Sequence, residues 1–307
     1  MIWKYKPSDL RGHFGRSRYF EGWFHKIYSR EYGISFILIY GYATRNTEER
    51  FGFIQIVSPD SEALMVYFPK AELSCDRERH IMRMGSNTLS RDRIEVTADG
   101  VSICLNFSGN QPIKSFRNSM GYSYFVPGLP CYHSVVNTAH LVSGVVQVRD
   151  SRYELDHELG YLEKNWGSSF PDRYFWLHAV DRTDSQVSIL FSQAEIQWLG
   201  RRFIRHVGHI RLYGWLIDIR DLIDLRIEIF NPDAGGLILR LMSRSIQLEI
   251  RITQGRRILF KGPRDGQLSR DIPHYADAMM DMSLGMGQTT RSLSLVGNYE
   301  YMRSDGL

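Results

Sequence analysis

Short runs of alternating apolar and polar residues dominate this chain. Between Val101 and Phe107 every second residue is apolar, and the intervening residues are Ser, Cys and Asn. Successive side chains of a strand point to opposite faces, so this period predicts a strand with one face in a core and one in water. The same period recurs at residues 225–229 and 246–252. Continuous apolar runs, which predict strands buried on both faces, occur at residues 36–42, 51–57 and 187–191.

Turn-forming residues separate these runs, as at 98–100, 58–60, 231–236 and 262–266. Helical periodicity is not sustained anywhere; the best helix candidate, residues 275–282, is short, and the approach to a strand is its alternative. Many short strands at regular spacing are typical of a β-sandwich or β-barrel. We therefore expect an all-β protein.

The length of 307 residues allows one large domain or two ordinary ones. A polar stretch at residues 150–157 precedes a segment rich in motifs. We place a domain boundary there, which gives an N-terminal domain at residues 1–158 and a C-terminal domain at 159–307.

Composition excludes several classes of protein. The longest apolar run, Ile34 to Tyr42, is far shorter than the roughly 20 residues of a membrane span, and the N-terminus has no apolar signal region. Three widely spaced cysteines, Cys75, Cys104 and Cys131, fit neither a disulfide framework nor a zinc motif. Acids and bases are well mixed at a net charge of +4, which argues against a nucleic-acid partner. We expect a soluble, cytoplasmic protein with reduced thiols.

Aromatic residues make up 13% of the chain, with 6 Trp, 17 Tyr and 16 Phe. Such enrichment favours pleated sheet. Large aromatic side chains also suit a pocket for a flat or unsaturated ligand.

The first segment with unusual chemistry runs from Tyr19 to Lys26. In a strand, Tyr19, Glu21, Trp23 and His25 share one face. A carboxylate between two aromatic rings is unusual on a solvated surface. This face is what the interior of a ligand-holding barrel would present.

The second such segment begins at Glu163 and runs through Pro171 to His178. Glu163 and Asn165 share one strand face, and Tyr174, Trp176 and His178 share another. Both faces combine titratable groups with large aromatic rings.

These surroundings predict acid chemistry. Burial against apolar rings raises the pKa of a carboxyl, and a carboxylic acid that stays protonated near neutral pH can act as a general acid. Desolvated aromatic faces stabilise a cation by about 2 kcal/mol each. The alternative is structural: Glu21 and Glu163 pair with Lys26, Lys164 or an Arg across the sheet, and the tryptophans are core residues.

Other chemistries find no support in the sequence. There is no Gly-x-Ser-x-Gly elbow for Ser168 and no phosphate-binding or dinucleotide glycine loop. His206 and His209 would point to opposite faces of a strand, and no carboxylate or thiolate cluster completes a site with His133 and His140. We expect no metal site.

At its two unusual segments the chain resembles the tocopherol cyclase family. Phe20-Glu21-Gly22-Trp23 matches the family's first block, and Glu163 to Gly167, followed by Phe170-Pro171 and Trp176, matches its middle block. Residues 126–133 and 140–144 resemble the region between the blocks. The likeness weakens after about residue 200. His25 and His178 depart from the family pattern by placing titratable groups where it usually has other residues.

The resemblance implies two lipocalin-like antiparallel β-barrel or sandwich units packed side by side. It also implies a reaction in which an acid protonates a prenyl alkene and a phenol oxygen captures the carbocation, without a metal or redox cofactor. The expected partner is a hydrophobic small molecule. If this molecule is dissolved in a membrane, the protein would reach it by peripheral contact with the membrane surface. A carrier or sensor of a hydrophobic molecule is the alternative function, and a purely structural or partner-binding β protein is the third.

Candidate residues follow from the two segments and the resemblance. The predicted acid is Glu163 or Glu21, and Asn165 or His178 would orient it or the phenol. We expect Glu21, Trp23, Glu163, Trp166 and Trp176 to border one cavity that His178 faces. The predicted substrate-binding residues are Tyr19, Trp23, Trp166, Tyr174, Trp176 and His140.

Overall fold

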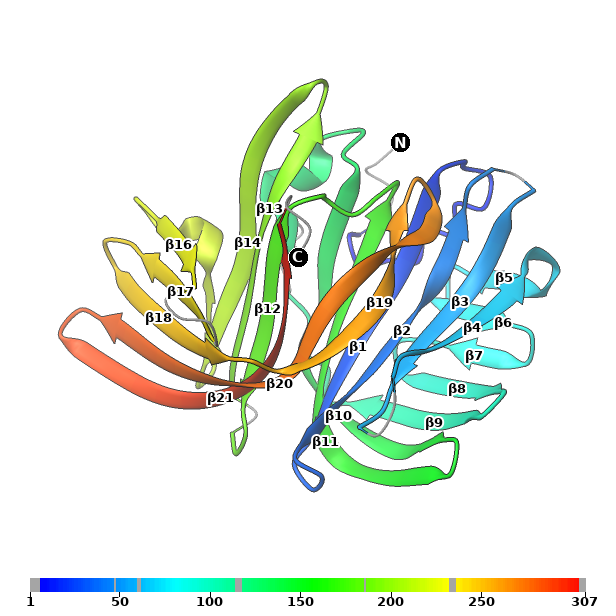
Figure 1. Cartoon of the computed structure of the whole chain (residues 1–307), viewed down its shortest axis with the longest axis horizontal. Coiled ribbons are helices and arrows are strands. Elements are labelled where there is room, and N and C mark those ends of the chain that lie inside the picture. The colour runs from blue at the N-terminus through cyan, green and yellow to red at the C-terminus, as the bar shows by residue number, and fades with distance from the viewer. Residues whose placement is uncertain are drawn as a thin grey trace. The chain divides into compact units, whose positions relative to one another are not determined.

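The structure is a computed structural model that describes residues 6–46, 48–59, 62–113, 118–184, 186–231 and 236–303. Over these residues the chain is nearly all β, with two large antiparallel sheets (Figure 1). It divides into two compact units. Unit 1 comprises Met1–Pro171, Gln197–Arg201 and Phe260–Asp271, and unit 2 comprises Asp172–Ile196, Arg202–Leu259 and Ile272–Leu307. The expected all-β fold of two lipocalin-like units is confirmed.

The first sheet has 11 strands among the described residues. In spatial order they are β4 (Leu64–Pro69), β3 (Arg50–Val57), β2 (Ile34–Thr44), β1 (Tyr19–Ser29), β11 (Ser151–Gly167), β10 (Cys131–Val148), β9 (Val101–Ser108), β8 (Arg93–Ala98), β7 (Asn87–Leu89), β6 (Ile81–Met84) and β5 (Leu73–Asp76). Two 3₁₀ segments join them, η2 (Lys70–Glu72) and η3 (Asn118–Phe125). A Cβ added to Gly52 on β3 would collide with Leu73 on β5, so the two ends of this sheet curl toward each other.

The second sheet follows the order β15 (Trp215–Asp218), β14 (Arg201–Leu212), β13 (Val187–Trp198), β12 (Tyr174–Asp181), β21 (Thr289–Met302), β20 (Gln267–Met286), β18 (Ile246–Thr253), β17 (Gly236–Met242) and β16 (Arg226–Phe230). A further strand, β19 (Arg256–Arg264), pairs with β20, and η4 (Ile219–Asp221) follows β15.

Every strand segment predicted from hydrophobic patterning lies within a strand, except that residue 225 precedes β16 by one position. The helix candidate at 275–282 is wrong and its strand alternative is confirmed, because these residues lie inside β20. The turn expected at 262–266 is confined to Asp265 and Gly266, because Pro263 belongs to β19. This strand pairs with β20 on one side, and a strand that is bonded on one side tolerates the missing N–H of a proline. The domain boundary drawn at residue 158 falls within β11. Asp60 and residues 232–235 lie outside the described residues.

Strand β1 runs through the middle of the first sheet, bonded to β2 on one side and β11 on the other. Tyr19, Trp23 and Ile27 pack into the large core cluster of unit 1, so we call their side of the sheet the inner face. Phe20 lies on the opposite, outer face in a smaller apolar cluster with Cys131 and Leu268. The register pairs Glu21 with Trp166 and Phe24 with Glu163.

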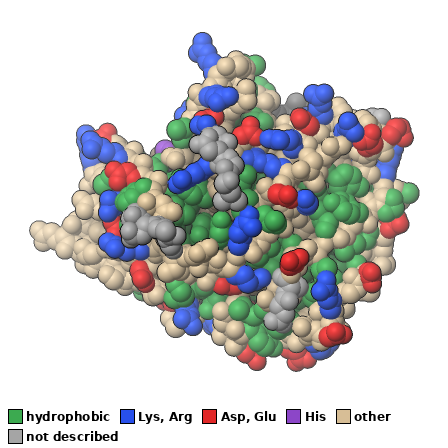
Figure 2. Space-filling view, in the orientation of Figure 1, with side chains coloured by type: hydrophobic (Ala, Val, Ile, Leu, Met, Phe, Trp, Pro, Cys, Tyr) green, Lys and Arg blue, Asp and Glu red, His purple; other side chains and the backbone are tan. Residues whose placement is uncertain are grey.

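Figure 2 shows one side of the molecule, on which charged side chains of both signs are interspersed with apolar ones. No concentrated basic surface is seen on this side. Among the described residues no helix has the length and apolar character of a membrane span.

Candidate functional site

Glu21 lies on the inner face of unit 1 with no exposed surface. Its carboxylate accepts hydrogen bonds from the backbone N–H groups of Arg11 (2.8 Å) and Gly12 (3.0 Å) and from the Tyr42 hydroxyl (2.7 Å). The ammonium of Lys164, 2.6 Å away, completes this shell. Burial by itself would raise the pKa of Glu21, but Lys164 and the donors outweigh it and hold that pKa below its ordinary value.

Glu21 is therefore a paired carboxylate and not a protonated acid. The expectation that burial against aromatic rings raises its pKa is wrong, because the sequence pattern does not show the donors that surround it. The alternative, an ion pair with Lys164, is confirmed.

Lys164 itself is fully buried between two indole rings, 5.1 Å from the centroid of Trp23 and 4.8 Å from that of Trp166. It also donates to the backbone oxygen of Asp9. Burial lowers the pKa of Lys164 to about 8 despite the neighbouring Glu21. The two tryptophans, which were predicted to bind substrate, thus enclose a cation of the chain itself.

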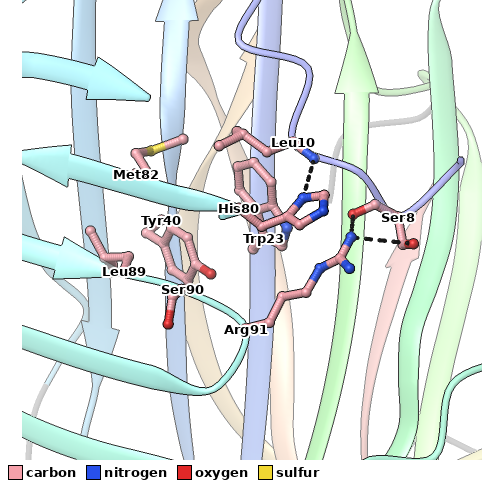
Figure 3. Close-up of a pocket in the computed structure, with 9 residues that line it drawn as sticks. All are labelled: Ser8, Leu10, Trp23, Tyr40, His80, Met82, Leu89, Ser90 and Arg91. Atoms are coloured by element: carbon pink, nitrogen blue, oxygen red, sulfur yellow. Dashed lines mark hydrogen bonds between the residues drawn. The ribbon is translucent and has the colours of Figure 1, made fainter. Parts of the chain in front are cut away.

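The inner face opens into a small pocket at one end, where the Trp23 and Tyr40 rings stack at 5.4 Å (Figure 3). Its empty space is about 250 Å³ with the open solvent at its mouth included, and the enclosed part is close to the minimum for one water molecule. His80 accepts from the Leu10 N–H at 3.3 Å, and Arg91 donates to the Ser8 carbonyl at 2.8 Å, which ties the N-terminal segment across this end.

The pocket's other lining residues are Met82, Leu89 and Ser90.

His140, a predicted substrate-binding residue, lies in the core of unit 1 and not in this pocket. Its ring is 6.2 Å from that of His25 and 5.2 Å from that of Phe107. Among the described residues neither histidine has a hydrogen-bond partner for its ring nitrogens. Burial lowers the pKa of His140 to about 4, and burial together with His140 lowers the pKa of His25 well below its usual value.

These buried neutral imidazoles predict acid lability. A histidine whose pKa is lower in the folded than in the unfolded state contributes stability that is complete above the unfolded pKa of about 6.5 and is lost as the pH falls toward 4. Protonation of His140 alone should lower the free energy of unfolding by about 3 kcal/mol as the pH falls through this range. Urea denaturation at pH 7.0 and 4.5 should show a smaller pH difference for His140→Phe than for the natural protein. An equal difference in the two proteins would contradict this assignment.

Glu163 lies on the outer face, in a different environment. Its Oε2 accepts from the Tyr161 hydroxyl at 2.7 Å and lies 3.0 Å from Nε2 of His133, and its Oε1 accepts from the Asn165 amide at 3.2 Å. The side chains of His133 and Glu163 are 14% and 6% exposed, so this cluster reaches the surface through the imidazole. Phe24 and Val135 stand opposite Glu163 on the two neighbouring strands.

The cluster continues beyond His133. Nδ1 of this ring lies 2.9 Å from the hydroxyl oxygen of Ser119, a residue of η3. Cys131, two residues before His133, is buried, and its thiol pKa is raised by burial and by the nearby Glu163. Phe20 and Phe170 pack edge to face at 5.4 Å in the apolar cluster that includes Cys131. On the outer face, the hydrogen-bonded cluster around Glu163 thus borders the apolar cluster that contains Phe20 and Cys131.

The strand register separates the two predicted acids. Glu21 is opposite Trp166 on β11, and Glu163 is three residues away in a strand whose side chains alternate, so Glu21 and Glu163 point to opposite faces of one sheet. The expectation that both border one cavity is wrong. Asn165 lies where the sequence placed it, on the same face as Glu163, and Tyr19 lies buried on the inner face with Glu21.

Tyr174, Trp176 and His178 belong to unit 2 and share one face of β12, as predicted. Figure 1 shows β12 in the second sheet beside β21. The Trp176 ring is 6.5 Å from that of His178 and 6.0 Å from that of His274. The Tyr174 hydroxyl donates to Glu300 at 2.6 Å.

This second polar cluster extends through His274, whose Nδ1 is 2.8 Å from Glu300 and whose Nε2 is 3.1 Å from the Asn298 amide nitrogen. All of these residues lie within unit 2.

Sequence reasoning missed several members of the two polar clusters. Tyr161 could have been found, because it precedes Glu163 by two residues and must share its face. His133, Ser119, His274 and Glu300 could not. The pairing of β10 with β11 brings His133, η3 brings Ser119 to His133, and β21, which pairs with both β12 and β20, brings Glu300 and His274 together.

The fold and the site define a class of protein: a two-unit, lipocalin-like β protein with buried carboxyl clusters. The tocopherol cyclase-like family model matches residues 111–213, so the resemblance stated from the motifs is confirmed over this segment. A search of curated protein sequences returns no match.

Solved structures share the fold over nearly the whole chain. CghA bound to Sch210972 superposes with a TM-score of 0.64 at 11% identity, covering 94% of this chain and 89% of that one. A putative AttH protein from Nitrosomonas europaea gives 0.55 at 12% identity, covering 96% and 98% of the two chains. Kievitone hydratase from Nectria haematococca gives 0.51 at 8% identity, covering 96% and 93%. At these identities the likeness establishes the fold alone.

Proposed function

We propose that this protein catalyses the acid-promoted cyclisation of a prenylated aromatic or polyene substrate, and that the Glu163 cluster supplies the proton. One observation carries the proposal. Glu163 is a nearly buried carboxyl that three side chains hold in place, and all of them lie in the segment that matches the tocopherol cyclase-like family. Glu21, paired with Lys164, lies outside that segment.

The reaction moves one proton onto the substrate and takes one back. The acid cluster gives a proton to one alkene carbon, and the other carbon becomes a tertiary cation. The substrate's phenol oxygen forms a bond to that cation and releases its own proton to the cluster. Product and substrate have the same mass, so the enzyme belongs to the isomerase class, and the chemistry requires no redox cofactor.

The residues around Glu163 suit these steps. Asn165 donates to one carboxyl oxygen and leaves the other with His133 and Tyr161, so the carboxyl is held in one orientation. The apolar cluster of Phe20, Phe170 and Cys131 on the same face suits a hydrophobic chain. A cytoplasmic enzyme of this kind would take its substrate from a membrane surface by peripheral contact.

A carrier of hydrophobic molecules is the second candidate. It is favoured by the pocket at Trp23 and Tyr40, which is lined by aromatic and aliphatic side chains and bridged by the N-terminal segment. Such a pocket can bind without doing chemistry. Its small enclosed space would have to widen before a prenyl chain could enter.

Product analysis tests the proposal. The protein is incubated with a series of prenylated hydroquinones and polyenes, and each mixture is separated and weighed by mass spectrometry. We expect an isomer of unchanged mass that lacks one double bond and one free phenol. Tight binding of several substrates with no isomer from any of them would reject the cyclase and favour the carrier.

A further inference from the structure

Ser119, His133 and Glu163 form a continuous chain of hydrogen bonds across η3, β10 and β11. The Ser119 hydroxyl oxygen lies 2.9 Å from His133 Nδ1, and His133 Nε2 lies 3.0 Å from Glu163 Oε2. Both nitrogens of the imidazole are therefore engaged. The positions of the protons in this chain decide what it can do.

The Ser119 hydroxyl has a single hydrogen, and it has a second place to donate it. Its oxygen is also 3.1 Å from the backbone carbonyl of His133, with the geometry of a donor. A hydroxyl that donates to that carbonyl can only accept from the ring. His133 Nδ1 then carries a hydrogen.

One more proton must then lie between His133 and Glu163. With Nδ1 already protonated, the 3.0 Å contact from Nε2 to Oε2 needs a hydrogen on one of its two atoms. The pair is either an imidazolium beside a carboxylate or a neutral imidazole beside a carboxylic acid. Both forms hold one proton more than a neutral imidazole beside a carboxylate.

We propose that Ser119 is a positioning residue that makes the His133–Glu163 pair store this transferable proton. The inference rests on the proposed function, because this stored proton is the one that the alkene would receive. When the phenol closes the ring, its proton returns to the same pair, and the cluster is ready for another turnover.

Hydrogen bonds of the neighbouring Asn118 side chain hold Ser119 in place. The amide of Asn118 bridges β10, accepting from the Val135 N–H and donating to the Val135 carbonyl, both at 2.8 Å. Its oxygen also accepts from the Ser119 N–H at 2.6 Å. Asn118 has a φ of 45°, a conformation that costs energy in a residue other than glycine and persists only where the surroundings impose it.

The other groups that face the pair are compatible with a stored proton. Tyr161 donates to Glu163, and burial together with the neighbouring Glu163 raises the pKa of that phenol well above its usual value. Asn165 donates to the remaining carboxyl oxygen.

Nitrogen NMR of protein with ¹⁵N-labelled histidine rings tests the inference without a substrate. The His133 signals are identified by their loss in His133→Gln. At pH 7 we expect Nδ1 of His133 to show the shift of a protonated nitrogen. In Ser119→Ala the ring loses its acceptor, so Nδ1 should change to the shift of an unprotonated nitrogen while Nε2–H donates to the carboxylate.

Ser134→Ala is the matched control. Ser134 is the next residue after His133 and is buried like Ser119, but it lies on the inner face, and its hydroxyl has no hydrogen-bond partner among the described residues. This variant should leave the His133 signals unchanged. Where a cyclised product is found, Ser119→Ala should lower kcat by about tenfold or more with KM within about twofold, and Ser134→Ala should not.

An unprotonated Nδ1 in the natural protein at pH 7 would overturn the inference, since Ser119 would then be donating to the ring. An identical Nδ1 shift in the natural protein and Ser119→Ala would overturn it as well. A protonated Nδ1 that depends on Ser119, in a protein that isomerises none of the substrates, would support the stored proton and reject the cyclase. The two proposals can thus fail separately.

Discussion

Lys164→Met is expected to lower the free energy of unfolding by about 3–5 kcal/mol. The substitution keeps the length of the side chain between Trp23 and Trp166 but removes the charge that Glu21 faces at 2.6 Å. Glu21 would remain a buried carboxylate without its cation, held only by neutral donors. Urea denaturation followed by tryptophan fluorescence measures the loss.

Two comparisons separate this cause from a general effect of replacing a lysine. Lys261→Met removes an ion pair of the same 2.6 Å length with Asp271, but both side chains are about half exposed, so we expect a much smaller loss than for Lys164→Met. The double variant Glu21→Gln with Lys164→Met leaves no unpaired charge and should be less destabilised than the sum of the single variants. Equal losses for Lys164→Met and Lys261→Met would show that the buried pair contributes nothing special.

Glu163→Gln should remove turnover while leaving the affinity for substrate within about threefold. The amide fills the same space but cannot supply a proton, and the lost interaction acts only in the transition state. Isothermal titration with a prenylated hydroquinone that the protein binds measures the affinity, and product analysis of the same sample measures the turnover.

Glu158→Gln is the control for this variant. Glu158 is a second buried carboxyl of β11, bound by the Ser29 hydroxyl at 2.6 Å and by the Arg30 N–H at 2.9 Å. Its substitution should lower stability without changing turnover per folded molecule. Normal turnover in Glu163→Gln would remove Glu163 from the mechanism and leave the cyclase without its proposed acid.

The strands could be predicted because their signal is local. Val101 to Phe107 alternates between buried and exposed positions in β9, as its sequence does. The same local signal is present at residues 275–282, because Ala276, Ala278 and Met280 are apolar at every second position, which is the period of a strand and not of a helix. These residues are buried at alternate positions of β20, which pairs with β18 and β21.

The chemistry of the site was predicted less well, since it depends on pairing between distant strands. The two glutamates look alike in sequence, and each is close to a lysine. In the structure Lys164, the chain neighbour of Glu163, points the other way and pairs with Glu21. Glu163 is bound to His133 instead, which the sequence analysis considered only as a metal ligand.

The pairing of β1 with β11 also has a consequence for the newly made chain. Phe20 is bonded opposite Gly167, so during synthesis β1 leaves the ribosome on the order of ten seconds before its partner is made. Through that interval β1 can pair only with β2, and its other edge, with Phe20, Trp23 and Phe24 beside it, is open to any strand nearby. Such long-range pairing slows folding. Early chaperone binding, which covers the open edge of β1 during that interval, should therefore raise the yield of this protein more than it would for a β protein built from hairpins.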